Sequence, residues 1–148
     1  SNATSFEDVT GSNLDEMVTT FDPIKEVYVG LDASGNVLGY VFKSTPTGFS
    51  GVIEVVTGIT IDGTITGVRI GNHQETPGLG AKAKDTAYYS QYAGKVSSMP
   101  IGISKSEPVG NDIQAITGAT ISSVAVTDGV NASVEAFNWI LEKGGLEN

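Results

Sequence analysis

The sequence predicts an α+β fold, mainly an antiparallel β-sheet with packed helices, including one long helix near the C-terminal end. Strand-like runs separated by turn signals fill the first half, whereas helical spacing of apolar residues governs the second half. With 148 residues, of which 39% are hydrophobic, the chain is long enough for one domain with a real core. The 19 glycines predict many turns and sharp loops.

The N-terminal half begins with a short helix and continues as hairpins. Residues 12–21 have helical spacing, and Pro23 ends this helix. Asp32 and Asp62 are interpreted as turn formers, because an Asp side chain binds nearby backbone N–H groups. These turns join four predicted strands: residues 27–31, 37–42, 52–61 and 64–70.

The middle of the chain is less regular. Residues 82–92 predict a helix that Gly94 ends. One further strand is expected within residues 96–104, and residues 107–116 are expected to form a loop.

The long helix is expected to start at Ser122 or Ser123, as its cap, and to reach about residue 143. Gly129 lies inside it and costs about 1 kcal/mol relative to Ala, which indicates a close packing contact there. Residues 1–23 are therefore treated as a lead-in, 24–143 as the domain and 144–148 as a tail. The apolar stripe comprises Val126, Val130, Val134, Phe137 and Leu141.

Charge and composition exclude several classes of function. The formal net charge of −9 argues against nucleic-acid backbones and anionic lipid surfaces as partners. The absence of cysteine excludes disulfides, thiolate nucleophiles, iron–sulfur clusters and cysteine-bound zinc. No run reaches the about 18–20 apolar residues that span a bilayer. However, Ser1-Asn2-Ala3 is typical of a cleaved tag, so a membrane anchor or export signal is expected upstream.

Catalytic side chains are scarce. The single histidine, His73, lies in a Gly/Pro loop, where a solvent-exposed or loop-bracing role is favoured over a catalytic triad or a metal site. Tyr88, Tyr89 and Tyr92 have helical spacing and are interpreted as core or groove residues. The chemistry is therefore expected to come from a cofactor rather than from a nucleophile or a metal.

Two loops rich in small residues stand out, at residues 73–80 and 117–123. In the second loop, Gly118 and Ala119 leave little bulk around the Thr120 hydroxyl at the start of the long helix. A helix N-terminus favours a phosphate, although the local sequence alone also fits an ordinary Thr or Ser cap. Together the loops would suit a flat, phosphorylated ligand.

The chain resembles the FMN-binding domain found in the G subunit of the Rnf electron-transport complex, and in the related C subunit of the sodium-pumping NADH:quinone reductase. The resemblance covers residues 24–141. It rests on two motifs in this order, Glu75-Thr76-Pro77-Gly78-Leu79-Gly80 and Thr117-Gly118-Ala119-Thr120-Ile121-Ser122-Ser123.

The resemblance implies that Thr120 carries FMN through a phosphoester bond made by a dedicated flavin transferase. It also implies that Thr76 and Leu79 lie along the isoalloxazine ring. A chain produced without the transferase is expected to lack FMN. The remaining cofactor-binding residues that the resemblance implies are Thr117, Gly118, Ala119, Ser122, Glu75, Gly78 and Gly80.

The implied function is electron transfer within a membrane-bound, ion-translocating redox complex. The partners are its other subunits and the transferase, and the domain would lie on the extracytoplasmic side of the cell membrane. One departure from the family pattern is Gln114, which stands where an acidic residue is usual, with Asp112 two residues earlier. Two alternatives stay open: the FMN-binding domain of a stand-alone exported flavoprotein or reductase, and a flavin-free module of the same fold.

Overall fold

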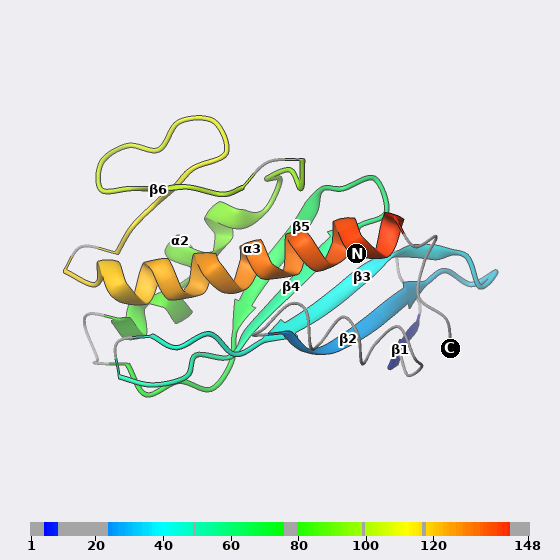
Figure 1. Ribbon diagram of the computed structural model, residues 1–148, viewed down its shortest axis with the longest axis horizontal. Coiled ribbons are helices and arrows are strands. Elements are labelled where there is room, and N and C mark those ends of the chain that lie inside the picture. The colour runs from blue at the N-terminus through cyan, green and yellow to red at the C-terminus, as the bar shows by residue number, and fades with distance from the viewer. Residues whose placement is uncertain are drawn as a thin grey trace.

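The computed structural model describes residues 5–8, 24–48, 50–75, 80–98, 100–116 and 118–142. A five-stranded antiparallel sheet has its strands in chain order, and α3 (Thr120–Glu142) runs across one face of it (Figure 1). The predicted α+β fold is confirmed. The helix predicted at residues 12–21 lies outside the described residues. The strands are β1 (Ser5–Asp8), β2 (Ile24–Leu31), β3 (Val37–Ser44), β4 (Val55–Thr60) and β5 (Ile65–Ile70).

The sheet follows from the alternation of buried and more exposed residues along its strands. In β2 and β3, the buried Val27 lies opposite the buried Phe42, and both side chains face the core. The turn before β3 forms as predicted, since Asp32 accepts hydrogen bonds from backbone N–H groups of the turn, and these bonds lower the pKa of its carboxyl. Strand β1, which pairs with β2, was not predicted.

Helix α3 buries most of its predicted apolar stripe against the sheet. Phe137 contacts Tyr40 edge-on, with 6.3 Å between the ring centroids. The prediction for Leu141 was wrong: it is 45% exposed, and Ile140 fills the last core position, three residues after Phe137 rather than four. The close contact predicted at Gly129 is confirmed, because a Cβ there would lie 2.7 Å from Ser44 Oγ.

The helix predicted at residues 82–92 forms as three short pieces: η1 (Gly80–Lys84), α2 (Thr86–Tyr89) and η2 (Ser90–Tyr92). The break after η1 arises because Asp85 has an extended backbone, with ψ of 140°. Gly94 has a φ of +86° and ends the helical segment as predicted.

The strand predicted within residues 96–104 is short. Only β6 (Ile103–Ser104) is regular, and it pairs in parallel with β7 (Ile113–Gln114), which lies in the predicted loop. Val96 forms an isolated bridge with Thr64 instead, and the side chain of Asn111 binds both backbone groups of Val96. Because the Asn111 side chain occupies the hydrogen-bonding groups of Val96, these groups are not available to a neighbouring strand.

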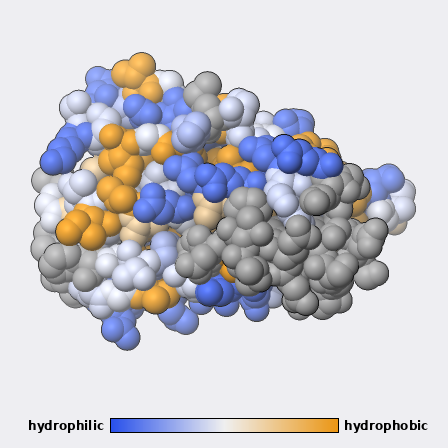
Figure 2. All heavy atoms as spheres, viewed as in Figure 1, coloured by the Kyte–Doolittle hydropathy of each residue, from blue (hydrophilic) through white to orange (hydrophobic). Residues whose placement is uncertain are grey.

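The face crossed by α3 shows a mixture of hydrophilic and hydrophobic side chains (Figure 2). Within the part of the chain that the structure describes, no helix has the length and apolar character needed to cross a membrane.

Candidate functional site

The first residue of α3 is the threonine whose hydroxyl was singled out from the sequence. Thr120 is the first residue of this 23-residue helix and is half-buried, whereas Gly118 before it is exposed. Gly118 has a φ of +76°, a conformation that glycine adopts at little cost, and the turn it makes leads directly into the helix. The N-terminus of a long helix presents N–H groups and a partial positive charge, so an anion bound at this hydroxyl would be stabilised.

The prediction that Ser122 or Ser123 caps α3 was wrong, because both serines lie inside its first turn. The hydroxyl of Ser123 accepts a hydrogen bond from the Ile116 N–H (2.8 Å) and donates one to the Ala119 carbonyl (3.0 Å). Ser123 therefore braces the loop that leads into the helix. The residue immediately before the helix is Ala119, whose buried methyl group packs against the core.

Glu75 connects this helix to two other segments. Its side chain is 5% exposed, and the Ser122 hydroxyl donates a hydrogen bond to its Oε1 atom. The Ser50 N–H donates to Oε2 at 2.7 Å. The Glu75 N–H donates to His73 Nδ1 at 3.1 Å, so the predicted loop-bracing role of His73 is confirmed. The two loops singled out from the sequence thus meet at a buried carboxylate.

Gly80 lies against the same contact. A Cβ at this position would collide with Ser122 Oγ and would lie 2.8 Å from Glu75 Cβ, so only glycine fits. The structure thereby brings together six of the predicted site residues around the first turn of α3: Glu75, Gly80, Gly118, Ala119, Thr120 and Ser122. The other predicted residues in these loops, Thr76, Gly78, Leu79 and Thr117, lie outside the described residues.

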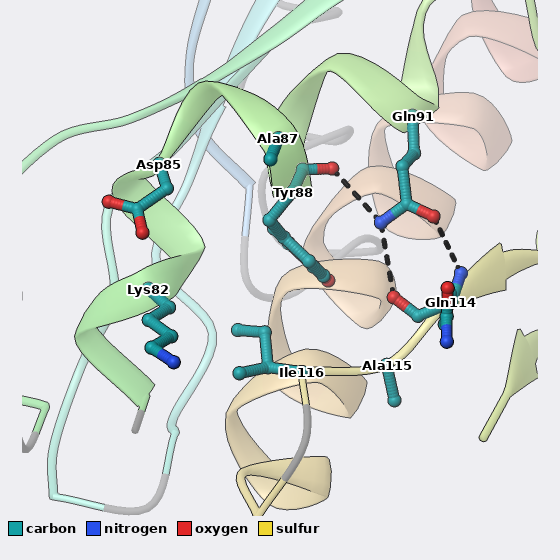
Figure 3. A pocket seen from close by; sticks show the side chains of 8 residues that line it. All are labelled: Lys82, Asp85, Ala87, Tyr88, Gln91, Gln114, Ala115 and Ile116. Atoms are coloured by element: carbon teal, nitrogen blue, oxygen red, sulfur yellow. Dashed lines mark hydrogen bonds between the residues drawn. The ribbon is translucent and has the colours of Figure 1, made fainter. Parts of the chain in front are cut away.

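An open cleft of about 390 Å³ lies between the η1–α2–η2 segment and the residues that precede α3 (Figure 3). This volume lies within the range of about 300–1,000 Å³ that is usual for small-molecule sites. Apart from Tyr88, which was interpreted as a core or groove residue, the lining residues were not predicted from the sequence. Three of them immediately precede the motif of Thr120. The cleft is lined by Lys82, Asp85, Ala87, Tyr88, Gln91, Gln114, Ala115 and Ile116.

Beneath the cleft, buried hydroxyl groups form a chain. The Tyr88 and Tyr92 hydroxyls lie 2.6 Å apart, and the Tyr92 hydroxyl lies 2.7 Å from Thr127 Oγ1 on α3. Burial raises the pKa of Tyr88 and raises that of Tyr92 well above the ordinary tyrosine value. Both phenols are therefore protonated at neutral pH and serve as hydrogen-bonding core residues, as the sequence predicted.

Within the described ranges, no group of three or more His, Asp and Glu side chains is arranged to hold a metal ion. The site has three parts: a threonine hydroxyl at a helix N-terminus, two joined loops, and a cleft whose lining combines apolar side chains with the ammonium group of Lys82 and the carboxylate of Asp85.

Comparison with known proteins defines the class to which this site belongs. Residues 48–135 match the FMN-binding domain family, and the chain belongs to that family. It is 40% identical over 143 residues to the G subunit of the Na⁺-translocating ferredoxin:NAD⁺ oxidoreductase complex of Acetobacterium woodii, an alignment that covers 91% of this chain and 68% of the relative. It is 39% identical over 134 residues to the G subunit of an ion-translocating oxidoreductase complex of Methanosarcina acetivorans, covering 90% and 68%.

Solved structures show the same fold. The crystal structure of Shewanella oneidensis NqrC superposes with a TM-score of 0.64 at 25% identity, covering 77% of this chain and 59% of that one. The resemblance of the chain to the G subunit of Rnf-type complexes and to the related NqrC is therefore confirmed.

Proposed function

We propose that Thr120 carries FMN through a phosphoester bond, and that the domain transfers electrons within a membrane-bound, ion-translocating oxidoreductase complex. One observation carries this assignment: the half-buried Thr120 lies at the N-terminus of α3, two residues after an exposed glycine, while Ser122 is turned inward. A phosphate attached to Thr120 would lie at the positive end of the helix dipole.

The described residues fit FMN in two further respects. The cleft beside the residues that precede α3 has apolar groups, among them Ala87 and Ile116, that suit a flat ring, and its charged groups are Lys82 and Asp85. Glu75 and Gly80 fix the first of the two loops, residues 73–80, against α3. Bound FMN would supply the redox chemistry, while the chain holds the phosphate, orients the ring and controls access of solvent.

The partners follow from the relatives. Those relatives are named as subunits of ion-translocating oxidoreductase complexes, so we assign this domain to contact other subunits of such a complex. We further propose that a flavin transferase modifies it and that it lies on the extracytoplasmic side of the cell membrane, held by an N-terminal anchor. Labelling of intact cells with a reagent that does not cross the membrane tests the side: an unlabelled domain in cells that hold the complex would contradict it.

The attachment is tested by co-expression with a flavin transferase, followed by intact-mass and peptide mass spectrometry. The expected product gains the mass of FMN less one water, because the ester forms between the phosphate and the Thr120 hydroxyl. Thr120→Ala should gain nothing. The matched control is Thr86→Ala, which removes an exposed threonine near the cleft and should keep the adduct. An adduct on Thr120→Ala would show that Thr120 is not the attachment site.

A flavin-free module is the second candidate, because the exposed Gln114 replaces the acidic residue that the transferase motif usually has. An unmodified wild-type chain, isolated beside a relative that the same transferase does modify, would favour it.

A further inference from the structure

We infer that Glu75 and Ser122 form a positioning pair that determines the direction in which the Thr120 hydroxyl points. The inference rests on the proposed role of Thr120 as the attachment site. Neither residue needs to touch FMN, because both act through the first turn of α3.

Helix geometry carries the first step. Successive residues of an α-helix are rotated by about 100°, so side chains two residues apart point in nearly opposite directions. Ser122 is 2% exposed and donates its hydroxyl proton to Glu75 inside the protein. With Ser122 held inward, Thr120 is directed to the other side of the helix, where it is half-buried. Ile121, between them, is 57% exposed.

The position of Glu75 is itself defined on several sides. Its second oxygen accepts the hydrogen bond from the Ser50 N–H. A Cβ at Gly48 would lie 2.7 Å from Glu75 Oε1, and a Cβ at Gly80 would collide with Ser122 Oγ. The glycines thus leave the space that the pair fills. A buried carboxylate that accepts a hydrogen bond at each oxygen is held strongly in place, since a shift would leave a desolvated charge unsatisfied.

Attachment of a phosphate group depends on this direction. The Thr120 oxygen must form a bond to the phosphorus of a donor that carries FMN as a phosphoanhydride. The anhydride P–O bond breaks as this bond forms, the second phosphate of the donor departs, and the hydroxyl proton passes to a base of the transferase. Small errors in orientation slow such reactions substantially. Loss of the Glu75–Ser122 contact frees the first turn of α3 to rotate or fray, so the hydroxyl spends less time in the productive direction.

The test compares Ser122→Ala, Glu75→Ala and Glu75→Gln. Amide hydrogen exchange is measured on the unmodified chains, and the initial rate of FMN attachment is measured by mass spectrometry with limiting transferase. Ser133→Ala is the matched control, because Ser133 is also a buried serine of α3 and bonds to the Gly129 carbonyl, far along the helix from Thr120.

We expect Ser122→Ala to slow attachment at least fivefold and Glu75→Ala at least tenfold, with faster exchange of the Ser50 amide in Glu75→Ala. Glu75→Gln should recover most of the rate lost in Glu75→Ala. Its amide oxygen can accept from the Ser50 N–H, and its NH₂ group can donate to Ser122, whose hydroxyl can reverse its role. Ser133→Ala should attach FMN at the wild-type rate even where its stability falls.

Attachment to Ser122→Ala at the wild-type rate would overturn the inference, as would a Glu75→Gln variant as slow as Glu75→Ala. If Glu75→Ala does not fold, the conservative Ser122→Ala decides. Failure of the proposed function looks different: the wild-type chain itself then gains no adduct, or gains it elsewhere, whereas hydrogen exchange on the unmodified chains still reports whether Glu75 and Ser122 hold the first turn.

Discussion

The side-chain amide of Gln91 binds both backbone groups of Gln114 (Figure 3). The Gln114 N–H donates to Gln91 Oε1 at 2.7 Å, and Gln91 Nε2 donates to the Gln114 carbonyl at 3.1 Å and to that of Tyr88 at 3.2 Å. The Gln91 side chain thereby satisfies the backbone N–H and carbonyl groups at the free edge of β7, as a neighbouring strand would. It ties η2 to the segment that leads into Thr120.

Replacement of Gln91 is expected to loosen this segment. Gln91→Ala removes both bonds to Gln114, so the Gln114 amide should exchange at least tenfold faster, and unfolding should cost about 1–2 kcal/mol less. Gln91→Glu is the graded control, because it keeps an acceptor for the Gln114 N–H but loses the donor. Hydrogen exchange followed by NMR measures the exchange rate of the Gln114 amide in both variants, and urea unfolding measures their free energy of unfolding. If the Gln114 amide of Gln91→Ala is still protected as in the wild type, the contact with Gln91 does not stabilise this segment.

Restoring an acidic residue at Gln114 should speed flavin attachment. The side chain of Gln114 is exposed and its backbone is held by Gln91, so Gln114→Asp changes the surface without disturbing β7. The resemblance to the transferase motif predicts a several-fold faster rate by timed mass spectrometry. If Asp112 already substitutes for the missing acid, Asp112→Asn should slow the wild-type rate. Ser34→Asp, which adds the same charge at an exposed position in the turn between β2 and β3, is the control.

The buried hydroxyl chain makes Tyr92 important for stability. Tyr92→Phe removes one hydrogen-bond partner each from the Tyr88 hydroxyl and from Thr127 Oγ1, and this should lower the free energy of unfolding by about 1–3 kcal/mol. Tyr89→Phe is the matched control: its hydroxyl contacts Thr86 at the surface, and the loss should stay below about 0.5 kcal/mol. Urea unfolding monitored by circular dichroism compares the two, and equal losses would contradict the prediction.

The same tyrosines predict how stability changes in alkali. Burial raises the pKa of Tyr88 and Tyr92 in the folded protein, whereas unfolded tyrosines ionise near pH 10. Above that pH the unfolded state binds fewer protons than the folded state, so the free energy of unfolding falls as pH rises. Well below pH 10 both tyrosines are protonated in the folded and the unfolded state, so they do not change the free energy of unfolding with pH. Urea unfolding between pH 8 and about 11 should show a steeper decline for the wild type than for Tyr92→Phe; parallel curves would refute the assignment.

Most of the sheet could be predicted from the sequence because its strands are local hairpins. The alternation of apolar residues and turn residues such as Asp32 predicts structure from neighbouring residues alone. The structure confirms these hairpins. The parallel pair β6–β7 could not be predicted, since each strand has two residues and its partner is chosen by tertiary packing. The break at Asp85 likewise depends on how the segment packs rather than on spacing.

The site was predictable where a motif could be read directly and was missed where contacts are long-range. Thr120 was identified as a hydroxyl between small residues at a helix start, and the structure confirms that it is the first residue of α3. Ser122 was expected to be a cap because serine is favoured there, but a carboxylate 47 positions away in the sequence binds its hydroxyl instead. The lining of the cleft by Lys82 and Gln91 had no local signal.

The order of the elements along the chain has a consequence for maturation. Strands β2 to β5 each pair with their neighbours in sequence, so this meander can form while the rest of the chain is still being synthesised. Helix α3 is the last described element, and the inward contact of Ser122 exists only after it docks. If Thr120 receives the flavin and the Glu75–Ser122 contact speeds attachment, the chain is loaded fastest only after α3 has docked.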